Sequence, residues 1–209
     1  MTPWVTERTW RLGLMRGLAF LLLAVNVTGC RTQALVDAPA ELPSQYDLYR
    51  AFRQHAEVLV VYGAQDPAAG ARYRALLEKL DTRTREHKAP SRKLQLRIRS
   101  DREVSQEELR QYPTFLIGTP ASNQWLMAWE AQLPLAFEEQ AFTFFGTSYA
   151  DPSQAFILPL YPHPLQDTLP LPLGLITGND DAAILALLES RYEQGWFWLR
   201  WGSWGYEIH

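Results

Sequence analysis

Three segments of the chain share one order: a short apolar run, a glycine, a few polar residues and the start of a helical pattern. They are VLVVYG-AQDP from residue 58, TFLIG-TPASN from residue 114 and LGLITG-NDDA from residue 173. Apolar runs without alternation are typical of strands that are buried on both faces. Strands that alternate with helices favour parallel pairing. The sequence therefore predicts an α/β fold with a mostly parallel sheet, in three layers with helices on both faces.

Local signals predict the other elements. Asp66 and Pro67 suit the N-cap and the first position of a helix, and Ser105 with Glu108 forms a capping box. Residues 94–100 alternate apolar and polar side chains, which indicates a half-exposed strand near a sheet edge. We expect strands at 57–63, 94–100, 114–118 and 173–178, and helices at 66–80, 105–111, before Pro134, and from Asn179 or Asp180 to about 192.

Residues 141–162 predict a β-hairpin at the edge of the sheet. Apolar residues alternate in its two arms, and Asp151-Pro152 marks the turn. Pro159 favours an edge strand because proline cannot donate a ladder hydrogen bond.

The N-terminus is typical of an export signal. Residues 1–17 hold three arginines and one glutamate, and the run LAFLLLAV follows at 18–25. This apolar stretch is too short for a spanning helix, which needs roughly 20 residues, and it suits a secretory signal. The chain's single cysteine, Cys30, closes the segment and excludes an intramolecular disulfide.

Val27-Thr28-Gly29-Cys30 resembles the lipobox of bacterial lipoproteins, with an apolar residue three places before the cysteine and a small one directly before it. The resemblance implies that Cys30 receives a diacylglycerol, that the signal is cut before it, and that the new amine is acylated. Residue 31 is Arg rather than Asp, which by analogy with some Gram-negative lipoproteins implies the outer membrane, facing the periplasm or the exterior. An ordinary cysteine after a plain signal or anchor is the alternative.

These features divide the chain into a signal peptide (1–29), a proline-containing tether (30–45) and one α/β domain (46–209). Without the signal, 17 basic and 22 acidic residues remain, a net charge of −5. This balance gives no support for a nucleic-acid partner. It also means that the lipid, rather than charge, has to attach the protein to the membrane.

In open α/β sheets ligands bind beyond the carboxyl ends of the strands, where helix N-termini favour anions. The residues that can rim such a pocket are Gly63, Gly118, Thr119, Ser122, Asn123, Gly178 and Asn179. The alternative is that any strand-to-helix turn requires such glycines and small polar residues.

Motifs for specific chemistry are absent from the sequence. It has no G-x-G-x-x-G or P-loop, no G-x-S-x-G elbow, and no histidine pair with metal-ligand spacing, so we expect no cofactor and no metal. His163, between Pro162 and Pro164, is a candidate general base that flanking prolines hold in place; the alternative is polar surface. Asp180-Asp181 suits either paired carboxylates or an N-cap followed by a first-turn acid.

The C-terminal segment is rich in aromatic residues. Trp196, Trp198, Trp201 and Trp204 fall within eleven residues that also hold Phe197 and Tyr206. Such a cluster suits an exposed surface for a glycan, a membrane interface or a partner. It equally suits a last strand whose large rings pack into the core.

Residues 114–178 also resemble α/β accessory segments that lie beside catalytic domains in some secreted bacterial hydrolases. The likeness rests on the runs GTPASN, QLPLAF and YPHPL. It implies a non-catalytic role. We therefore expect an envelope lipoprotein whose α/β domain binds a protein partner or an envelope polymer such as a glycan. The alternatives are a small lipid-anchored hydrolase with a pocket at the strand ends, and a solute-binding lipoprotein.

Overall fold

The computed structural model describes residues 43–86, 94–165, 171–193 and 206–209. They belong to one compact unit, Glu41–His209. The predicted signal peptide, Cys30 and the four C-terminal tryptophans lie outside the described residues. Among the helices that the structure describes, none combines the length and the apolar character needed to cross a bilayer.

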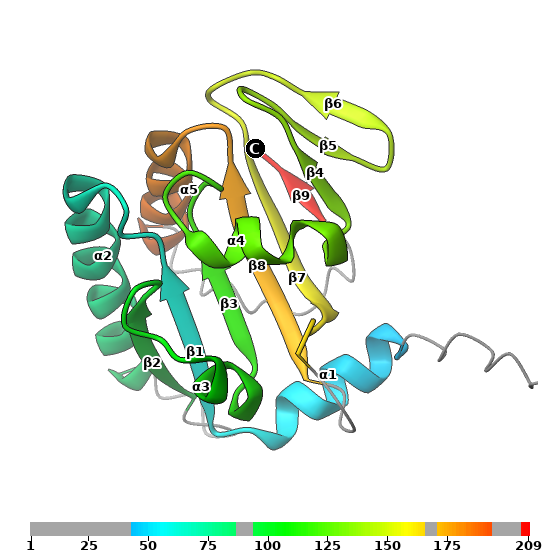
Figure 1. Cartoon of the computed structure of the whole chain (residues 1–209). Coiled ribbons are helices and arrows are strands. Elements are labelled where there is room, and N and C mark those ends of the chain that lie inside the picture. Colours follow the sequence, from blue (N-terminus) through cyan, green and yellow to red (C-terminus); the bar gives the residue numbers. More distant parts are fainter. Residues whose placement is uncertain (1–42, 87–93, 166–170, 194–205) are drawn as a thin grey trace, which may run out of the picture. The chain divides into compact units, whose positions relative to one another are not determined.

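A six-stranded sheet forms the centre of the domain (Figure 1). Its strand order is β2-β1-β3-β8-β7-β9. The strands are β1 (Glu57–Tyr62), β2 (Gln95–Ser100), β3 (Thr114–Ile117), β7 (Ala155–Pro162), β8 (Pro172–Gly178) and β9 (Glu207–Ile208). The first four in the order pair in parallel, whereas β7 pairs antiparallel with both β8 and β9. The predicted α/β fold with a mostly parallel sheet is confirmed.

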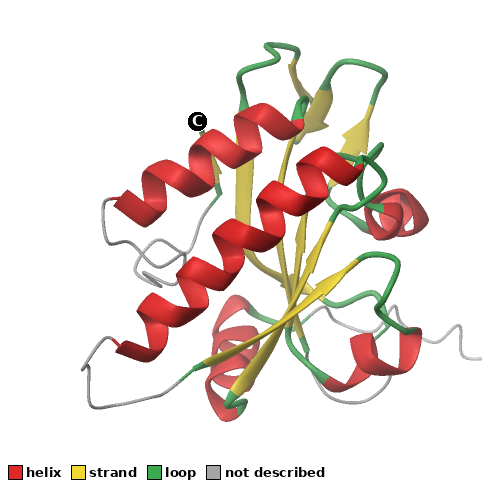
Figure 2. Ribbon diagram, turned by 90° about the vertical axis from the view of Figure 1, so that its left-hand side faces the viewer, coloured by secondary structure: helices red, strands yellow, loops and turns green. Residues whose placement is uncertain are grey.

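Helices cover both faces of this sheet, which explains the uninterrupted apolar runs. On one face Val58, Val60 and Tyr62 of β1 pack in a core with α2 (Pro67–Glu86) and α5 (Asp181–Glu193). Figure 2 shows these two long helices crossing the sheet side by side. On the other face Leu59 and Val61 join a second core. Its outer elements are α3 (Gln106–Gln111), α4 (Gln124–Trp129), the 3₁₀ turn η1 (Glu130–Gln132) and a small sheet.

Helix α1 (Gln45–Gln54), which precedes β1, was not predicted. Its signals are local: the Ser44 side chain accepts a hydrogen bond from the amide of Asp47, as an N-cap does. Leu48 and Phe52, four residues apart, are its buried side chains. The proline-containing segment before it favoured a tether, and two buried residues were too short a stripe to outweigh that.

The predicted hairpin at 141–162 is wrong, because its two arms lie in different sheets. β5 (Phe142–Phe144) pairs with β4 (Leu135–Phe137) and β6 (Thr147–Tyr149) in an antiparallel three-stranded sheet. β7 instead joins β8 in the main sheet. The strong turn signal at Asp151-Pro152 marks the passage between the sheets. Phe142 and Phe156 still contact each other, with ring centroids 5.7 Å apart, because the small sheet packs on the main one.

Pro159 lies in β7, where the register with β8 shifts between Leu158 and Tyr161. The described part of β9 pairs only with Phe156 and Ile157. Pro159 therefore lies at a strand irregularity, where its missing N–H interrupts none of the residue pairs that β7 forms with β8 and the described part of β9. The expectation of an edge strand was too simple, since β7 is flanked on both sides.

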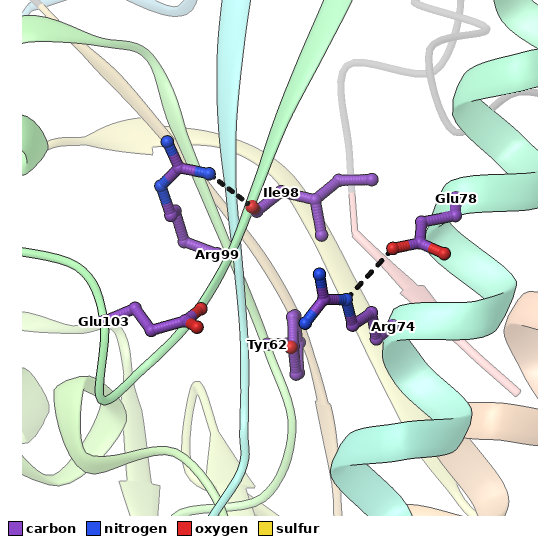
Figure 3. A pocket seen from close by; sticks show the side chains of 6 residues that line it. All are labelled: Tyr62, Arg74, Glu78, Ile98, Arg99 and Glu103. Atoms are coloured by element: carbon purple, nitrogen blue, oxygen red, sulfur yellow. Dashed lines mark hydrogen bonds and ion pairs between the residues drawn. The ribbon is translucent and has the colours of Figure 1, made fainter.

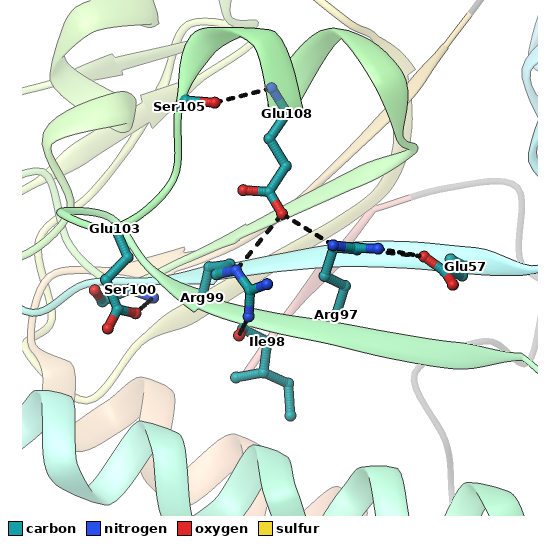
Figure 4. A network of polar contacts seen from close by, with 8 residues as sticks. All are labelled: Glu57, Arg97, Ile98, Arg99, Ser100, Glu103, Ser105 and Glu108. Carbon is teal, nitrogen blue, oxygen red and sulfur yellow. Dashed lines mark hydrogen bonds and ion pairs between the residues drawn. The ribbon is translucent and has the colours of Figure 1, made fainter.

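Strand β2 is the sheet edge that the alternation in 94–100 predicts. Its arginines form a charged network on this edge (Figure 4). Arg97 pairs with Glu57 at 3.0 Å, and Glu108 lies 3.5 Å from both Arg97 and Arg99. The Arg97 guanidinium also lies over the Tyr112 ring, 4.7 Å from its centroid. Charged side chains of this kind keep an edge strand from pairing with other chains.

Candidate functional site

The carboxyl ends of β1, β2, β3 and β8 meet in a buried polar cluster. Asp181, the first residue of α5, lies at its centre. One carboxylate oxygen, Oδ1, accepts hydrogen bonds from Ser122 Oγ and the Tyr73 hydroxyl, both at 2.8 Å, and from the Thr119 amide at 3.3 Å. The helix that follows β8 is thereby joined to the turn after β3 and to α2.

Tyr73 is fully buried in this cluster. Burial raises the pKa of its hydroxyl above the ordinary value, and the neighbouring Asp181 carboxylate raises it further. The phenol therefore remains a hydrogen-bond donor to Asp181 well into the alkaline range.

Asn123 joins the ends of β1 and β3. Its Nδ2 donates to the carbonyls of Val61 and Ile117, both at 3.1 Å, while its Oδ1 accepts from the Trp125 amide and caps α4. All of its polar atoms are therefore used inside the fold. Asn123, which the sequence offered as a possible ligand contact, instead holds β1 and β3 together.

Asp101 is the group at the strand ends that the sequence did not single out. It is 0% exposed, directly after β2. Its carboxylate accepts from the Ala64 amide at 2.9 Å, and from Gln65 Nε2 and the Gln124 amide at 3.0 Å each. One signal was available: Asp101 follows its strand at the place where the other three predicted strands have a glycine.

The two glycines after β1 and β3 are required by the close approach of Ser122. A Cβ on Gly63 or on Gly118 would lie 2.6 or 2.7 Å from Ser122 Oγ. Gly118 also has a φ of +132°, which side chains rarely tolerate. The chain itself thus occupies the crevice in which ligands of open α/β sheets usually bind.

Gly178 and Asn179 lie beside the connection from β6 to β7. Asn179 Nδ2 donates to the carbonyls of Tyr149 and Asp151, each at 2.9 Å, and a Cβ on Gly178 would meet the Gln154 carbonyl at 2.6 Å. Asp180 accepts from the Ala182 amide at 2.8 Å, as the cap of α5. The structure therefore places Thr119, Ser122 and Asn123 together with Asp181, and Asn179 in a separate set of contacts.

His163 does not join the strand-end cluster. It follows β7 and its amide donates to Leu171, so it lies at the amino end of β8, the opposite end of the sheet from Ser122. The ring is 1% exposed and packs edge-on against Trp129, with centroids 5.1 Å apart. Nδ1 accepts from the Leu165 amide at 3.1 Å, whereas Nε2 has no hydrogen-bond partner among the described residues. No described acidic or hydroxyl group orients it as a base.

Burial lowers the pKa of His163 from 6.5 to about 4. The unfolded chain binds the proton more readily, so stability is complete above pH 6.5 and falls as the pH drops towards 4. Between pH 7 and pH 5 the free energy of unfolding should fall by about 2 kcal/mol through this residue. Urea unfolding at both pH values, compared with His163→Asn, measures this difference, because Asn Oδ1 can accept from the Leu165 amide without titrating. An equal loss in both proteins would contradict it.

A surface pocket of about 320 Å³ lies between α2, β1 and β2 (Figure 3). It is lined by Tyr62, Arg74, Glu78, Ile98, Arg99 and Glu103. Arg74 Nε donates to Glu78 at 3.0 Å across one turn of α2, and Arg99 donates to the Ile98 carbonyl. The pocket thus has two cationic and two anionic side chains beside a phenol.

Local contacts shift the pKa of three groups in this pocket. The Ser100 amide, which donates to Glu103 at 3.0 Å, holds the pKa of that carboxyl below its ordinary value. The hydrogen bond to Glu78 raises the pKa of Arg74, and burial raises that of Tyr62. These shifts keep Arg74 and Glu103 charged at neutral pH, with Tyr62 as a neutral donor. The pocket offers donors and acceptors without net charge.

Within the described ranges, no three His, Cys, Asp or Glu side chains converge as the ligands of a metal ion do. No protein-family model, no curated protein and no solved structure matches the chain.

Proposed function

We propose that the chain is a lipid-anchored envelope protein whose α/β domain is non-catalytic and binds a protein partner or an envelope polymer. The observation that carries this proposal is the closed hydrogen bonding at the strand ends. In an open crevice, polar side chains at this place could take part in chemistry. Here they form hydrogen bonds that join strands and helices: those of Asp101, Asn123 and Asp181. Ser122 is buried and donates to Asp181, with no histidine beside it in the described residues.

The lipid anchor rests on Cys30 and the preceding VTG. We expect the N-terminal peptide from the membrane fraction to begin at Cys30 and to carry the mass of a diacylglycerol. Cys30→Ser should abolish the incorporation of labelled fatty acid, because the sulfur that accepts the lipid is absent. Thr32→Ser, two residues beyond the lipobox, is the matched control and should label as the wild type does. An unmodified peptide that retains Met1 would contradict the anchor.

The pocket beside β2 is suited to a neutral, hydrogen-bonding ligand such as a glycan or a polar peptide segment. Arg74→Gln removes one cation that lines it. Arg72→Gln is the matched control, since Arg72 is also exposed on α2 but pairs with Glu189 at 3.5 Å, outside the pocket. Affinity capture from solubilised envelope should recover a specific protein or glycan with the wild type and with Arg72→Gln, and much less with Arg74→Gln. Equal recovery with all three would exclude this pocket, and no specific recovery would count against the binding role.

A further inference from the structure

The turn between β5 and β6 holds an exposed aromatic ring in a disfavoured backbone conformation. Phe145 is 83% exposed, the highest value among the exposed large apolar side chains of the described residues. Phe145 has a φ of 47° and Gly146 a φ of 78°. Two central residues with positive φ are typical of a type I′ turn, in which Asn, Asp and Gly are preferred. Phenylalanine is an unfavourable choice here for folding alone.

The ring stands on an aromatic base. Phe145 contacts Phe144 with centroids 4.4 Å apart, and Phe144 in turn contacts Tyr206 at 4.5 Å and Phe156 at 4.8 Å. Phe144 and Phe156 are buried. The turn is therefore fixed to the core of the domain, and Phe145 is held outward from it.

The hairpin around Phe145 carries no formal charge. Residues 140–150 contain no Asp, Glu, Lys or Arg, and hydroxyl side chains such as Thr147 and Ser148 flank the ring. The other turn of the same small sheet holds Glu138 and Glu139, both exposed. An apolar ring with neutral, hydroxyl-bearing neighbours suits the headgroup region of a bilayer, because no charge loses its water there. Binding of Phe145 in a pocket of another protein would not require uncharged neighbours in this way.

The β5–β6 turn lies on the same side of the domain as the start of α1. Both are at the right-hand side of Figure 1, and both are on the far side in Figure 2. Tyr46, in the first turn of α1, is 63% exposed. The 14 residues between Cys30 and α1 can span at most about 50 Å. A lipid at Cys30 would therefore leave this side of the domain within reach of the membrane.

We propose that Phe145 and its turn insert into the interface of the bilayer that carries the lipid anchor, and so fix the orientation of the domain. This proposal rests on the anchor at Cys30. A second, non-covalent contact of this kind adds to the lipid without spanning the membrane. It leaves α2 and β2, on the left of Figure 1, facing away from the bilayer, with the pocket between them open to a partner.

The test uses the full chain, expressed with its signal and reconstituted from detergent into phosphatidylethanolamine vesicles. With Cys30 acylated, Thr147→Cys supplies the one free thiol for an environment-sensitive fluorophore. Glu139→Cys, at the other turn of the small sheet, is the matched position. We expect the label at 147 to be several-fold brighter on vesicles and quenched by lipid-borne nitroxides, and the label at 139 to behave as in water.

Phe145→Asn separates insertion from folding. Asparagine favours the turn, so the melting temperature should rise, while the label at 147 should lose its quenching and the protein should stay on the vesicles through its lipid. Quenching that survives Phe145→Asn overturns the proposal. So does a label at 147 that is aqueous on the vesicles, or one that becomes shielded only when envelope proteins are added. A chain without the lipid, absent from the vesicles, would instead contradict the anchor itself.

Discussion

Asp101→Ala should lower the free energy of unfolding by about 4 kcal/mol, because three donors lose the buried carboxylate that accepts from all of them. The Ala64 and Gln124 amides cannot turn away, since each belongs to a segment that the sheet or α4 fixes. A buried donor without a partner costs about 1–3 kcal/mol, and Gln65 can partly recover by reaching water. Urea denaturation at pH 7, followed by circular dichroism, measures the change.

Two variants sharpen the interpretation of that result. Asp101→Asn keeps the shape but offers one acceptor oxygen, and its NH₂ group would face another donor, so most of the loss should remain. Asp151→Ala removes a carboxylate that also accepts hydrogen bonds, from Ser153, but in an exposed turn, and should change little. An Asp101→Ala protein as stable as Asp151→Ala would show that water replaces the carboxylate.

Gly174→Ala should cost at least about 3 kcal/mol, at the upper end of the range for overpacked cores. A Cβ at this position in β8 would lie 2.0, 2.2 and 2.7 Å from three ring carbons of Phe115, its partner on β3. Phe115 is buried, so the ring cannot swing into solvent, and the two strands would have to separate. Thermal unfolding and urea denaturation both report the loss.

Removing the obstructing ring tests the cause of that loss. Phe115→Leu alone should destabilise the domain through lost packing, but Gly174→Ala should then add little, so that the double variant is more stable than the sum of the single changes predicts. Strict additivity would mean that the glycine is needed for its backbone rather than for the ring beside it.

The strands that lie in the middle of the sheet were predicted well because burial on both faces leaves a direct trace in the sequence. In β1, β3 and β8 this burial appears as apolar runs ended by glycine. The edge strand β2 is only partly buried, and its sequence alternates apolar and polar residues instead. The hairpin prediction failed because the alternation around Phe142 and Phe156 indicates that each lies in a strand, but does not indicate which strand pairs with it. Pairing is a long-range choice, which local pattern does not fix.

The candidate site was predicted in part. Gly63, Gly118, Ser122 and Asn123 do meet at the strand ends, as parallel strands require. The hydrogen bonding of this region is completed by the carboxylates of Asp101 and Asp181, which come from two other segments of the chain. The pocket beside β2 was missed because Arg74, Glu78 and Glu103 are ordinary surface residues in the sequence, and only the approach of α2 to β2 brings them together.

The polar cluster at the strand ends also implies an order of assembly. The contacts of Asp101 and Asn123 all fall between Val61 and Trp125, so that β1, β2 and β3 can close their share of the cluster from one continuous stretch of chain. Asp181 arrives later, with β8, whose partner residue for Thr114 is Leu173. Contacts over short sequence distances form faster than those over long ones. A chain that is synthesised from its N-terminus can therefore build half of its sheet before the other half, which brings Asp181, is complete.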